Sequence, residues 1–262
     1  MILDDIIDRR KETVRKAKSA VPLSSLEERI AHIADCVDFP ASLAGTRAGH
    51  YRIIAEVKKA SPSKGIIRKS FKPVAIAAEY ERNGAAAVSV LTEEDFFQGK
   101  LEYISDIKQQ VNIPVLRKDF IFDPYQVYET KAAGADALLL IAAVLEQNLL
   151  MDLLQLVEEL KMSALVEVHT ENELERVLEA GSPVIGINNR NLMSFVTNIQ
   201  TTCDLVTHIP KGTPIVSESG IGTLDDIRKL TACGVHAFLI GESLMRHEKP
   251  GEKLREFVYG VS

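Results

Sequence analysis

The stretch SALVEVHTENELERVLEAGSPVIGINNR, residues 163–190, contains the pattern that decides the fold. It opens with a short run of apolar and β-branched residues, passes through the capping-box sequence TENE into an amphipathic segment, and breaks at Gly181. A second apolar run, PVIGINNR, follows immediately. This order predicts a strand, a helix and a second strand, which together form one unit of an α/β fold with a parallel sheet.

The same unit recurs from Tyr51 to the end of the chain. Eight apolar runs alternate with amphipathic segments, and the expected strand ends lie 21 to 33 residues apart. Those ends are Lys58, Leu91, Lys118, Ile141, Glu167, Asn188, Glu218 and Gly241. Strands that are apolar almost throughout suit a sheet covered on both faces, and eight such units close into a (β/α)8 TIM barrel. The alternative is an open doubly wound sheet, but the loop KKASPSKG at 58–65 lacks the Gly-rich nucleotide pattern usual there.

The beginning of the chain has a different pattern. Amphipathic helices are expected at residues 3–18 and 24–36, before the strand–helix alternation starts. We therefore expect one α/β domain over residues 1–262, with an N-terminal helical extension at 1–48 and the barrel at 49–262.

Composition excludes several classes of partner. The 262 residues carry a net charge of −6 without a basic run, which argues against nucleic acid. The longest apolar run, ALLLIAAVL at 137–145, is too short to cross a bilayer, and the N-terminus turns acidic too early for a signal peptide. Cys36, Cys203 and Cys233 have neither zinc spacing nor a disulfide pattern, so we expect reduced thiols in a cytoplasmic protein. The protein is also expected to be a monomer.

Polar side chains end five of the eight expected strands. They are Glu56 and Lys58, Lys118, Glu167, Asn188 and Arg190, and Glu218 and Ser219. In a barrel these ends meet at one mouth, where catalytic residues lie. Because unpaired buried charges are costly, we expect these groups to pair with one another or with a ligand.

The loops after the seventh and eighth expected strands indicate a phosphate site. SESGIGTLDD at 217–226 and LIGESLMR at 239–246 each place glycine next to a helix start. Backbone N–H groups at such positions bind phosphate in many barrels. The carboxylate of Glu242 would repel phosphate, so we expect its N–H to face the site and its side chain to point away.

Glu167 and His169 lie on one face of an expected strand and could suggest a metal site. No third ligand is evident, and the TENE sequence places His169 at the rim of the following loop. We therefore expect no metal.

Together, seven segments resemble the indole-3-glycerol phosphate synthase family over essentially the whole chain. They are IAEVKKASPSKG, VLTEEDFFQG, VLRKDFIFDPYQ, ALVEVH, IGINNRNL, VSESGI and FLIGESLMR. The resemblance implies a cofactor-free step of tryptophan biosynthesis. In it, 1-(2-carboxyphenylamino)-1-deoxyribulose 5-phosphate is cyclised, decarboxylated and dehydrated to indole-3-glycerol phosphate.

The resemblance also implies roles for the strand-end residues. Lys118 is the general acid that activates the ketone, and Glu167 is the acid or base of the dehydration. Lys58 holds the substrate carboxylate or assists proton transfer, with Glu56 beside it. How the two lysines divide these roles stays open.

Further residues are implied in substrate binding. Asn188 and Arg190 orient substrate and catalytic groups, and Glu218 tunes the neighbouring cations. The expected phosphate neighbours are Ser61, Ser219, Gly220, Gly241 and Glu242. An apolar wall for the anthranilate ring is expected from Leu91, Phe97, Phe120 and Leu192, for which ordinary core packing is the alternative.

Three other functions fit parts of the pattern. A class I aldolase could use Lys118 as a Schiff-base amine. A phosphosugar isomerase such as phosphoribosylanthranilate isomerase would share the phosphate loops, and so would a non-catalytic phosphate-binding module.

Overall fold

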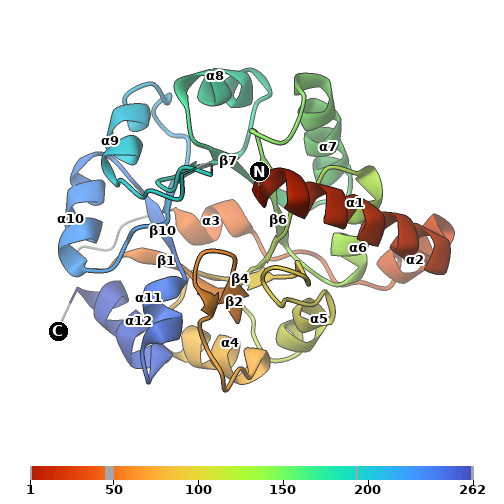
Figure 1. The fold of residues 1–262 in the computed structure, drawn as a ribbon, viewed down its shortest axis with the longest axis horizontal. Helices are drawn as coiled ribbons and strands as arrows, with labels where there is room; N and C mark the ends of the chain where they lie inside the picture. Colours follow the sequence, from red (N-terminus) through yellow and green to blue (C-terminus); the bar gives the residue numbers. More distant parts are fainter. Residues whose placement is uncertain (1, 45–49, 193, 261–262) are drawn as a thin grey trace.

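The computed structural model describes residues 2–44, 50–192 and 194–260. Within them, eight parallel strands close into a barrel and helices surround it (Figure 1), which confirms the predicted (β/α)8 TIM barrel. The barrel strands are β1 (Arg52–Val57), β4 (Ala87–Leu91), β5 (Val115–Lys118), β6 (Ala137–Ile141), β7 (Ser163–Val168), β8 (Val184–Asn188), β9 (Ile215–Glu218) and β10 (Ala237–Ile240). Every observed strand end lies within one residue of the expected end.

The barrel closes where β1 pairs with both β10 and β4. The surrounding helices are α4 (Pro73–Arg82), α5 (Glu102–Lys108), α6 (Pro124–Ala132), α7 (Gln147–Glu159), α8 (Glu171–Glu179), α9 (Gln200–Val206), α10 (Leu224–Ala232), α11 (Glu242–Arg246) and α12 (Pro250–Tyr259). Capping residues begin several of them as the sequence predicts. The Thr223 hydroxyl accepts the N–H of Asp226, and the carboxylate of Asp226 accepts the N–H of Thr223 in return.

Alternation along the strands sorts side chains between the barrel interior and the helices. Ile54, Leu116 and Leu165 point inward and form the buried floor of the barrel. Their neighbours two residues further along the strands share the inward register and reach the C-terminal mouth. Those neighbours are Glu56, Lys118 and Glu167. The apolar floor therefore supports a charged upper layer.

The N-terminal extension wraps the barrel from one end to the other. The N-terminal end of helix α1 (Ile2–Ala20) borders the C-terminal mouth and the helix runs outward past α6, α2 (Leu23–Ile30) packs beside α6, and α3 (Phe39–Leu43) closes the opposite end (Figure 1). The prediction of helix over 24–36 is wrong beyond Ile30. There the chain leaves the helix because the N–H of Val37 binds Asp136 at 2.8 Å, which holds it against the barrel. The expected boundary between residues 48 and 49 lies outside the described residues.

A disulfide joins Cys203 of α9 to Cys233 at the end of α10. The expectation of reduced thiols is therefore wrong for this pair, while Cys36 is free. The sequence could not predict the bond, because the two cysteines are 30 positions apart and meet only when the intervening β9 strand brings α9 and α10 side by side. Among the described residues, no helix is long and apolar enough to cross a membrane.

The loop after β1 folds into a small hairpin that the sequence does not predict. It pairs β2 (Ala60–Ser61) with β3 (Gly65–Ile66) in antiparallel register. The hairpin stands at the C-terminal mouth beside the ends of β1 and β4 (Figure 1).

Candidate active site

A cavity of about 440 Å³ opens at the C-terminal mouth of the barrel. Every residue that the sequence singled out for the site lines it. These residues converge because the C-terminal ends of all the barrel strands meet at this mouth, and inward-facing side chains there point into the cavity.

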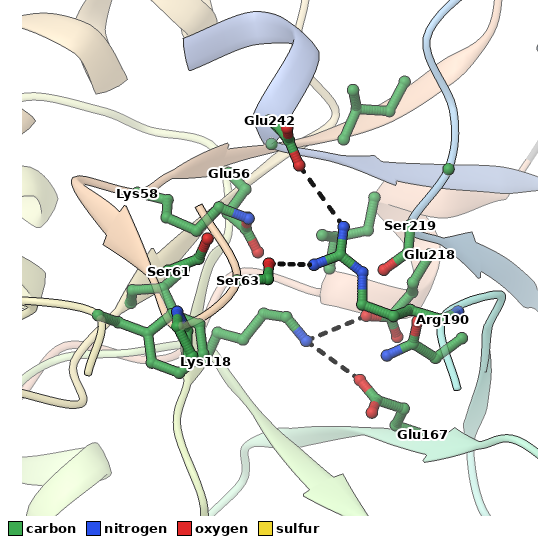
Figure 2. A pocket seen from close by; sticks show the side chains of 18 of the residues that line it. Glu56, Lys58, Ser61, Ser63, Lys118, Glu167, Arg190, Glu218, Ser219 and Glu242 are labelled. Carbon is green, nitrogen blue, oxygen red and sulfur yellow. Dashed lines mark hydrogen bonds and ion pairs between the residues drawn. The ribbon is translucent and has the colours of Figure 1, made fainter. Parts of the chain in front are cut away.

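Lys118 lies at the centre of the cavity between two carboxylates (Figure 2). Its Nζ is 3.2 Å from Oε2 of Glu167 and 3.1 Å from Oε2 of Glu218. Glu56 pairs with Lys58 at the end of β1. The polar floor of the cavity therefore consists of three buried carboxylates and two lysines.

Burial and mutual attraction separate the pKa values of this cluster. Burial alone would lower the pKa of Lys118, but the carboxylates of Glu218 and Glu167 hold it well above its usual value. Burial would raise the pKa of Glu167, yet Lys118 and His169 hold it well below its usual range. For Glu218, burial together with the charge of Glu167 prevails over Lys118 and raises the pKa to about 7. Near neutral pH, Glu218 is the group that readily gains or loses a proton.

Two glycines make room for the buried carboxylates. A Cβ at Gly241 would lie 2.8 Å from Cδ of Glu56 and closer still to its Oε1. A Cβ at Gly186, which faces inward on β8, would collide with Oε1 of Glu218. The sequence assigned Gly241 only to phosphate, but its missing side chain also accommodates Glu56.

Arg190 connects three loops over one side of the cavity. Its Nη1 donates to Oγ of Ser63 at 3.2 Å, and its Nη2 is 3.5 Å from Oε2 of Glu242 (Figure 2). Nε of Arg246 donates to the same carboxylate at 3.0 Å. The expectation that the Glu242 side chain points away from the site is wrong, because two arginines of the cavity wall hold it there.

The loop after β9 has a constrained backbone beside the cavity. Ser219 and Gly220 have positive φ angles of +66° and +77°. Asn189 braces this turn, donating from Nδ2 to the carbonyl of Ser219 at 3.0 Å and to Oγ of Ser217 at 2.9 Å. The first N–H groups of a helix lack intrahelical partners. The loop and the start of α11 both line the cavity.

An apolar wall faces the polar floor. The Phe97 and Phe120 rings lie 6.2 Å apart between centroids, and Leu91 and Leu192 also line the cavity. Leu3 and Ile6 of α1 add to the wall. The sequence missed these two, although the apolar face of the first helix signals that it covers another surface.

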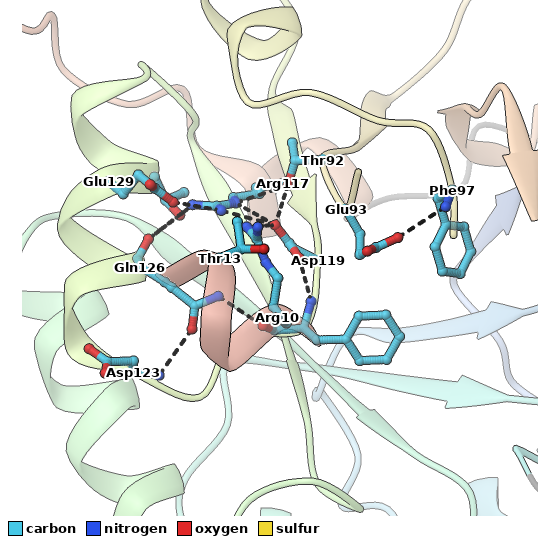
Figure 3. Close-up of polar contacts among 12 residues, drawn as sticks. Arg10, Thr13, Thr92, Glu93, Phe97, Arg117, Asp119, Asp123, Gln126 and Glu129 are labelled. Atoms are coloured by element: carbon cyan, nitrogen blue, oxygen red, sulfur yellow. Dashed lines mark hydrogen bonds and ion pairs between the residues drawn. The ribbon is translucent and has the colours of Figure 1, made fainter. Parts of the chain in front are cut away.

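A buried network clamps α1 to the strand end that carries Lys118 (Figure 3). Arg10 of α1 donates from Nη2 to Oδ2 of Asp119 at 2.5 Å. Arg117 donates to the same oxygen from Nη2 at 2.9 Å, and the Thr92 hydroxyl donates to it at 2.5 Å. Arg10, Arg117 and Asp119 are all at least nine-tenths buried. The sequence offered no sign that Arg10 would reach the barrel.

The similarity to known proteins covers almost the whole chain. A family model for indole-3-glycerol phosphate synthase matches residues 3–257. The indole-3-glycerol phosphate synthase of Alkaliphilus metalliredigens is 49% identical over 261 residues, which span 100% of this chain and 99% of that relative. The one from Burkholderia ambifaria is 47% identical over 259 residues, which span 98% of this chain and 99% of that relative. The chain belongs to the indole-3-glycerol phosphate synthase family. This confirms the resemblance carried by the seven sequence segments.

Solved structures share the fold at much lower identity. The orotidine 5'-phosphate decarboxylase of Pyrococcus horikoshii is 12% identical, with a TM-score of 0.60, and the match covers 80% of this chain and 100% of that chain. At that identity the likeness shows the fold alone, so the activity is argued from membership of the synthase family and from the site.

His169 is the first residue after β7 and precedes the helix cap Thr170, so it lies in the βα loop where the sequence placed it. Its ring is largely buried, with 10% of the side chain exposed, and Nε2 is 3.3 Å from Oε1 of Glu167. Among the described residues, no group of three or more His, Cys, Asp or Glu side chains could hold a metal ion.

Proposed function

We propose that this cavity converts 1-(2-carboxyphenylamino)-1-deoxyribulose 5-phosphate to indole-3-glycerol phosphate, the reaction of the synthase family. The observation that carries the proposal is Lys118, an ammonium held between Glu167 and Glu218 inside the cavity. The reaction needs an acid for a ketone oxygen, an acid for a leaving hydroxyl and a base for a carbon-bound proton. Three groups of suitable chemistry meet at this point.

Lys118 is assigned to the ketone. Its ammonium donates a proton to the carbonyl oxygen while the aryl carbon that bears the carboxylate attacks the carbonyl carbon. Loss of that carboxylate as CO₂ restores the aromatic ring. The raised pKa of Lys118 falls when substrate separates it from Glu218 and Glu167, which makes it a stronger acid at the moment of use.

The two glutamates are assigned to the dehydration. Glu167 is ionised and accepts the proton from the ring CH₂ group next to the new hydroxyl-bearing carbon. Glu218, with a pKa of about 7, supplies the proton that lets the hydroxyl leave as water. The sequence had given Glu218 only a tuning role.

The phosphate is assigned to the loops after β9 and β10. Ser219, Gly220 and Gly241 approach it through their backbone, and Arg190 supplies positive charge from the wall. In the free protein, the Arg190 guanidinium is paired with the carboxylate of Glu242. Asn188 orients Arg190, because its Oδ1 accepts the Arg190 backbone N–H at 3.0 Å.

The anthranilate end is assigned to the opposite side of the cavity. Lys58 binds the carboxylate, and the aromatic ring lies against Phe97 and Phe120. Figure 2 shows Ser61 beside Lys58 and apart from Ser219. The buried Ser61 hydroxyl has no hydrogen-bond partner among the described residues, so we assign it to this carboxylate rather than to the phosphate.

The structure disfavours the aldolase alternative. A Schiff-base lysine reacts as the neutral amine, whereas two carboxylates hold Lys118 protonated. Borohydride treatment with a ketose phosphate should leave Lys118 unmodified, and trapping of Lys118 would favour the aldolase.

The loop assignment is tested by comparing the substrate with its dephosphorylated analogue. We expect a large loss of kcat/KM for the analogue and competition by inorganic phosphate, because the phosphate anchors the reacting end. Equal handling of both compounds would contradict the assignment. Gly220→Val is unsuitable as a test, because Gly220 has positive φ and its Cβ would strike Thr197.

We also propose that the protein acts as a monomer in the cytoplasm. Light scattering of the purified protein and subcellular fractionation test the two statements separately.

A further inference from the structure

His169 has no part in the roles assigned above, yet it touches a residue that does. It follows Glu167 by two positions, just beyond the end of β7, and its ring lies between the carboxylates of Glu167 and Glu173. Nε2 of His169 is buried and makes no regular hydrogen bond, but it lies 3.3 Å from Oε1 of Glu167. Oε2 of Glu167 faces Lys118 at 3.2 Å. The two oxygens of Glu167 therefore have separate cationic neighbours.

The start of α8 holds the other side of the imidazole ring. Nδ1 of His169 is 3.2 Å from Oε2 of Glu173, and the His169 backbone N–H donates to the same oxygen at 2.7 Å. Glu173 is itself fixed, because its backbone N–H donates to Oγ1 of the helix cap Thr170 at 3.3 Å. The helix cap thus sets the orientation of the ring.

The charges around the ring favour its protonated form. Burial lowers the pKa of His169, but the carboxylates of Glu167 on β7 and Glu173 on α8 outweigh burial and raise it to about 10. An imidazolium has an N–H on both nitrogens and can serve both carboxylates. A neutral ring would leave one carboxylate facing a nitrogen lone pair.

We propose that His169 is a positioning residue, an imidazolium anchored by Glu173 that holds Oε1 of Glu167 and keeps Oε2 directed at the reacting atoms. This rests on the proposed function, in which Glu167 accepts a proton. When substrate draws Lys118 away, His169 remains as the cation that keeps Glu167 ionised and in place. The alternative is a purely structural role, in which His169 only joins β7 to α8.

The first measurement follows ionisation without using activity. Ring signals of His169 are assigned by comparison with His169→Gln, and the ring is titrated by NMR in the wild type and in Glu173→Gln. We expect the wild-type ring to stay protonated to about pH 10. It should deprotonate at lower pH in Glu173→Gln, because one of the two stabilising charges is lost. A wild-type ring that titrates near the ordinary value of about 6.5 would overturn the proposal.

The second measurement uses kinetics. We expect His169→Ala to lower kcat about 10–100-fold with KM changed less than about threefold, because the side chain that positions Glu167 is lost. His169→Gln, whose amide can still donate toward Glu167, should recover part of the loss. In Glu173→Gln, the alkaline fall of kcat should move to lower pH, because only the protonated ring positions Glu167.

His208→Ala is the matched control. His208 also pairs with a glutamate of α8, through Nδ1 3.5 Å from Oε1 of Glu171, but both side chains are exposed and outside the cavity. This variant should keep wild-type kcat and the wild-type pH profile. If His169→Ala lowered the free energy of unfolding but left kcat unchanged, His169 would have a structural role only. Absence of product in the wild type would instead contradict the proposed function, while the NMR titration would still decide the ionisation of His169.

Discussion

At the level of single residues, the site depends on three carboxylates that are buried in one cavity. Glu56, Glu167 and Glu218 are nearly fully buried, and two lysines and His169 pair with them directly among the described residues. Such crowding is costly and is typical of catalytic sites. It gives two carboxylates of the same chemistry different protonation, so that one can serve as acid and the other as base.

Lys118→Ala should abolish most turnover and leave the barrel folded. A positioned general acid contributes roughly 10²–10⁴-fold to kcat, so a loss in that range is expected. Steady-state kinetics with a far-ultraviolet circular dichroism spectrum as the folding control checks this. Retention of most of the wild-type kcat would contradict the role of Lys118 as the acid.

Glu167→Gln should slow the reaction far more than it weakens substrate binding. The amide keeps the shape of the side chain but cannot accept the proton. The expected signature is a large fall in kcat with KM nearly unchanged. A raised KM with normal kcat would mean that Glu167 only binds substrate uniformly.

Glu218→Gln should remove an ionisation near pH 7 from the profile of kcat/KM. Above its pKa of about 7, Glu218 has lost the proton that it donates to the leaving hydroxyl. Wild-type kcat/KM should accordingly fall as the pH rises through 7, and Glu218→Gln, which has no proton to donate, should be much slower but insensitive to pH in that range. A wild-type profile that is flat between pH 6 and 8 would contradict the ionisation assigned to Glu218.

The sequence predicted which polar residues end the strands, but not which side chains those residues contact. Alternation along a strand was enough to group Glu56 with Lys58, since both follow one local pattern. The contact between His169 and Glu173 depends on how α8 packs after its capping turn. The space that Gly186 provides for Glu218 arises between two neighbouring strands and appears in neither local pattern.

At the scale of elements, α1 acts as a wall of the cavity held by one buried ion pair. Arg10 reaches Asp119, the neighbour of Lys118 in the chain, and Leu3 and Ile6 face the cavity. The sequence predicted this helix from its periodicity. It could not predict where the helix docks, because a single apolar face fits many surfaces.

Arg10→Ala should lower the free energy of unfolding by about 3 kcal/mol, since it leaves Asp119 with fewer buried partners. It should also raise KM, because α1 no longer lies firmly over the apolar wall. Denaturant unfolding and steady-state kinetics measure the two effects. Arg9→Ala is the matched control: Arg9 pairs with Glu12 on the exposed face of the same helix and should change neither quantity. Equal effects of Arg10→Ala and Arg9→Ala on the free energy of unfolding and on KM would contradict the role of the Arg10–Asp119 pair in holding α1.

The disulfide between α9 and α10 should stabilise this side of the barrel. Closing a loop over a sequence separation of 30 residues contributes up to about 3–4 kcal/mol through the unfolded state. Reduction, or the change Cys203→Ser, should therefore lower the melting temperature by roughly 5–15 °C. Cys36→Ser should not respond to reduction differently from the wild type. An unchanged melting temperature on reduction would show that the bond is absent or contributes nothing.

At the scale of the whole molecule, regular strand–helix spacing was the strongest signal in the sequence. It fixed the strand ends within one residue and so placed the catalytic mouth. We propose that extension and barrel form one domain, because α1, α2 and α3 bury apolar side chains against the barrel. Unfolding should then show a single transition by fluorescence and circular dichroism, whereas separate transitions would indicate two units.

We propose that this cavity performs the synthase reaction with Lys118 as the acid. The most direct measurement incubates the purified protein with 1-(2-carboxyphenylamino)-1-deoxyribulose 5-phosphate and follows indole fluorescence together with released CO₂. We expect one indole-3-glycerol phosphate and one CO₂ for each substrate consumed, and almost no product with Lys118→Ala. Absence of indole product from folded wild-type protein, or equal rates for wild type and Lys118→Ala, would contradict it.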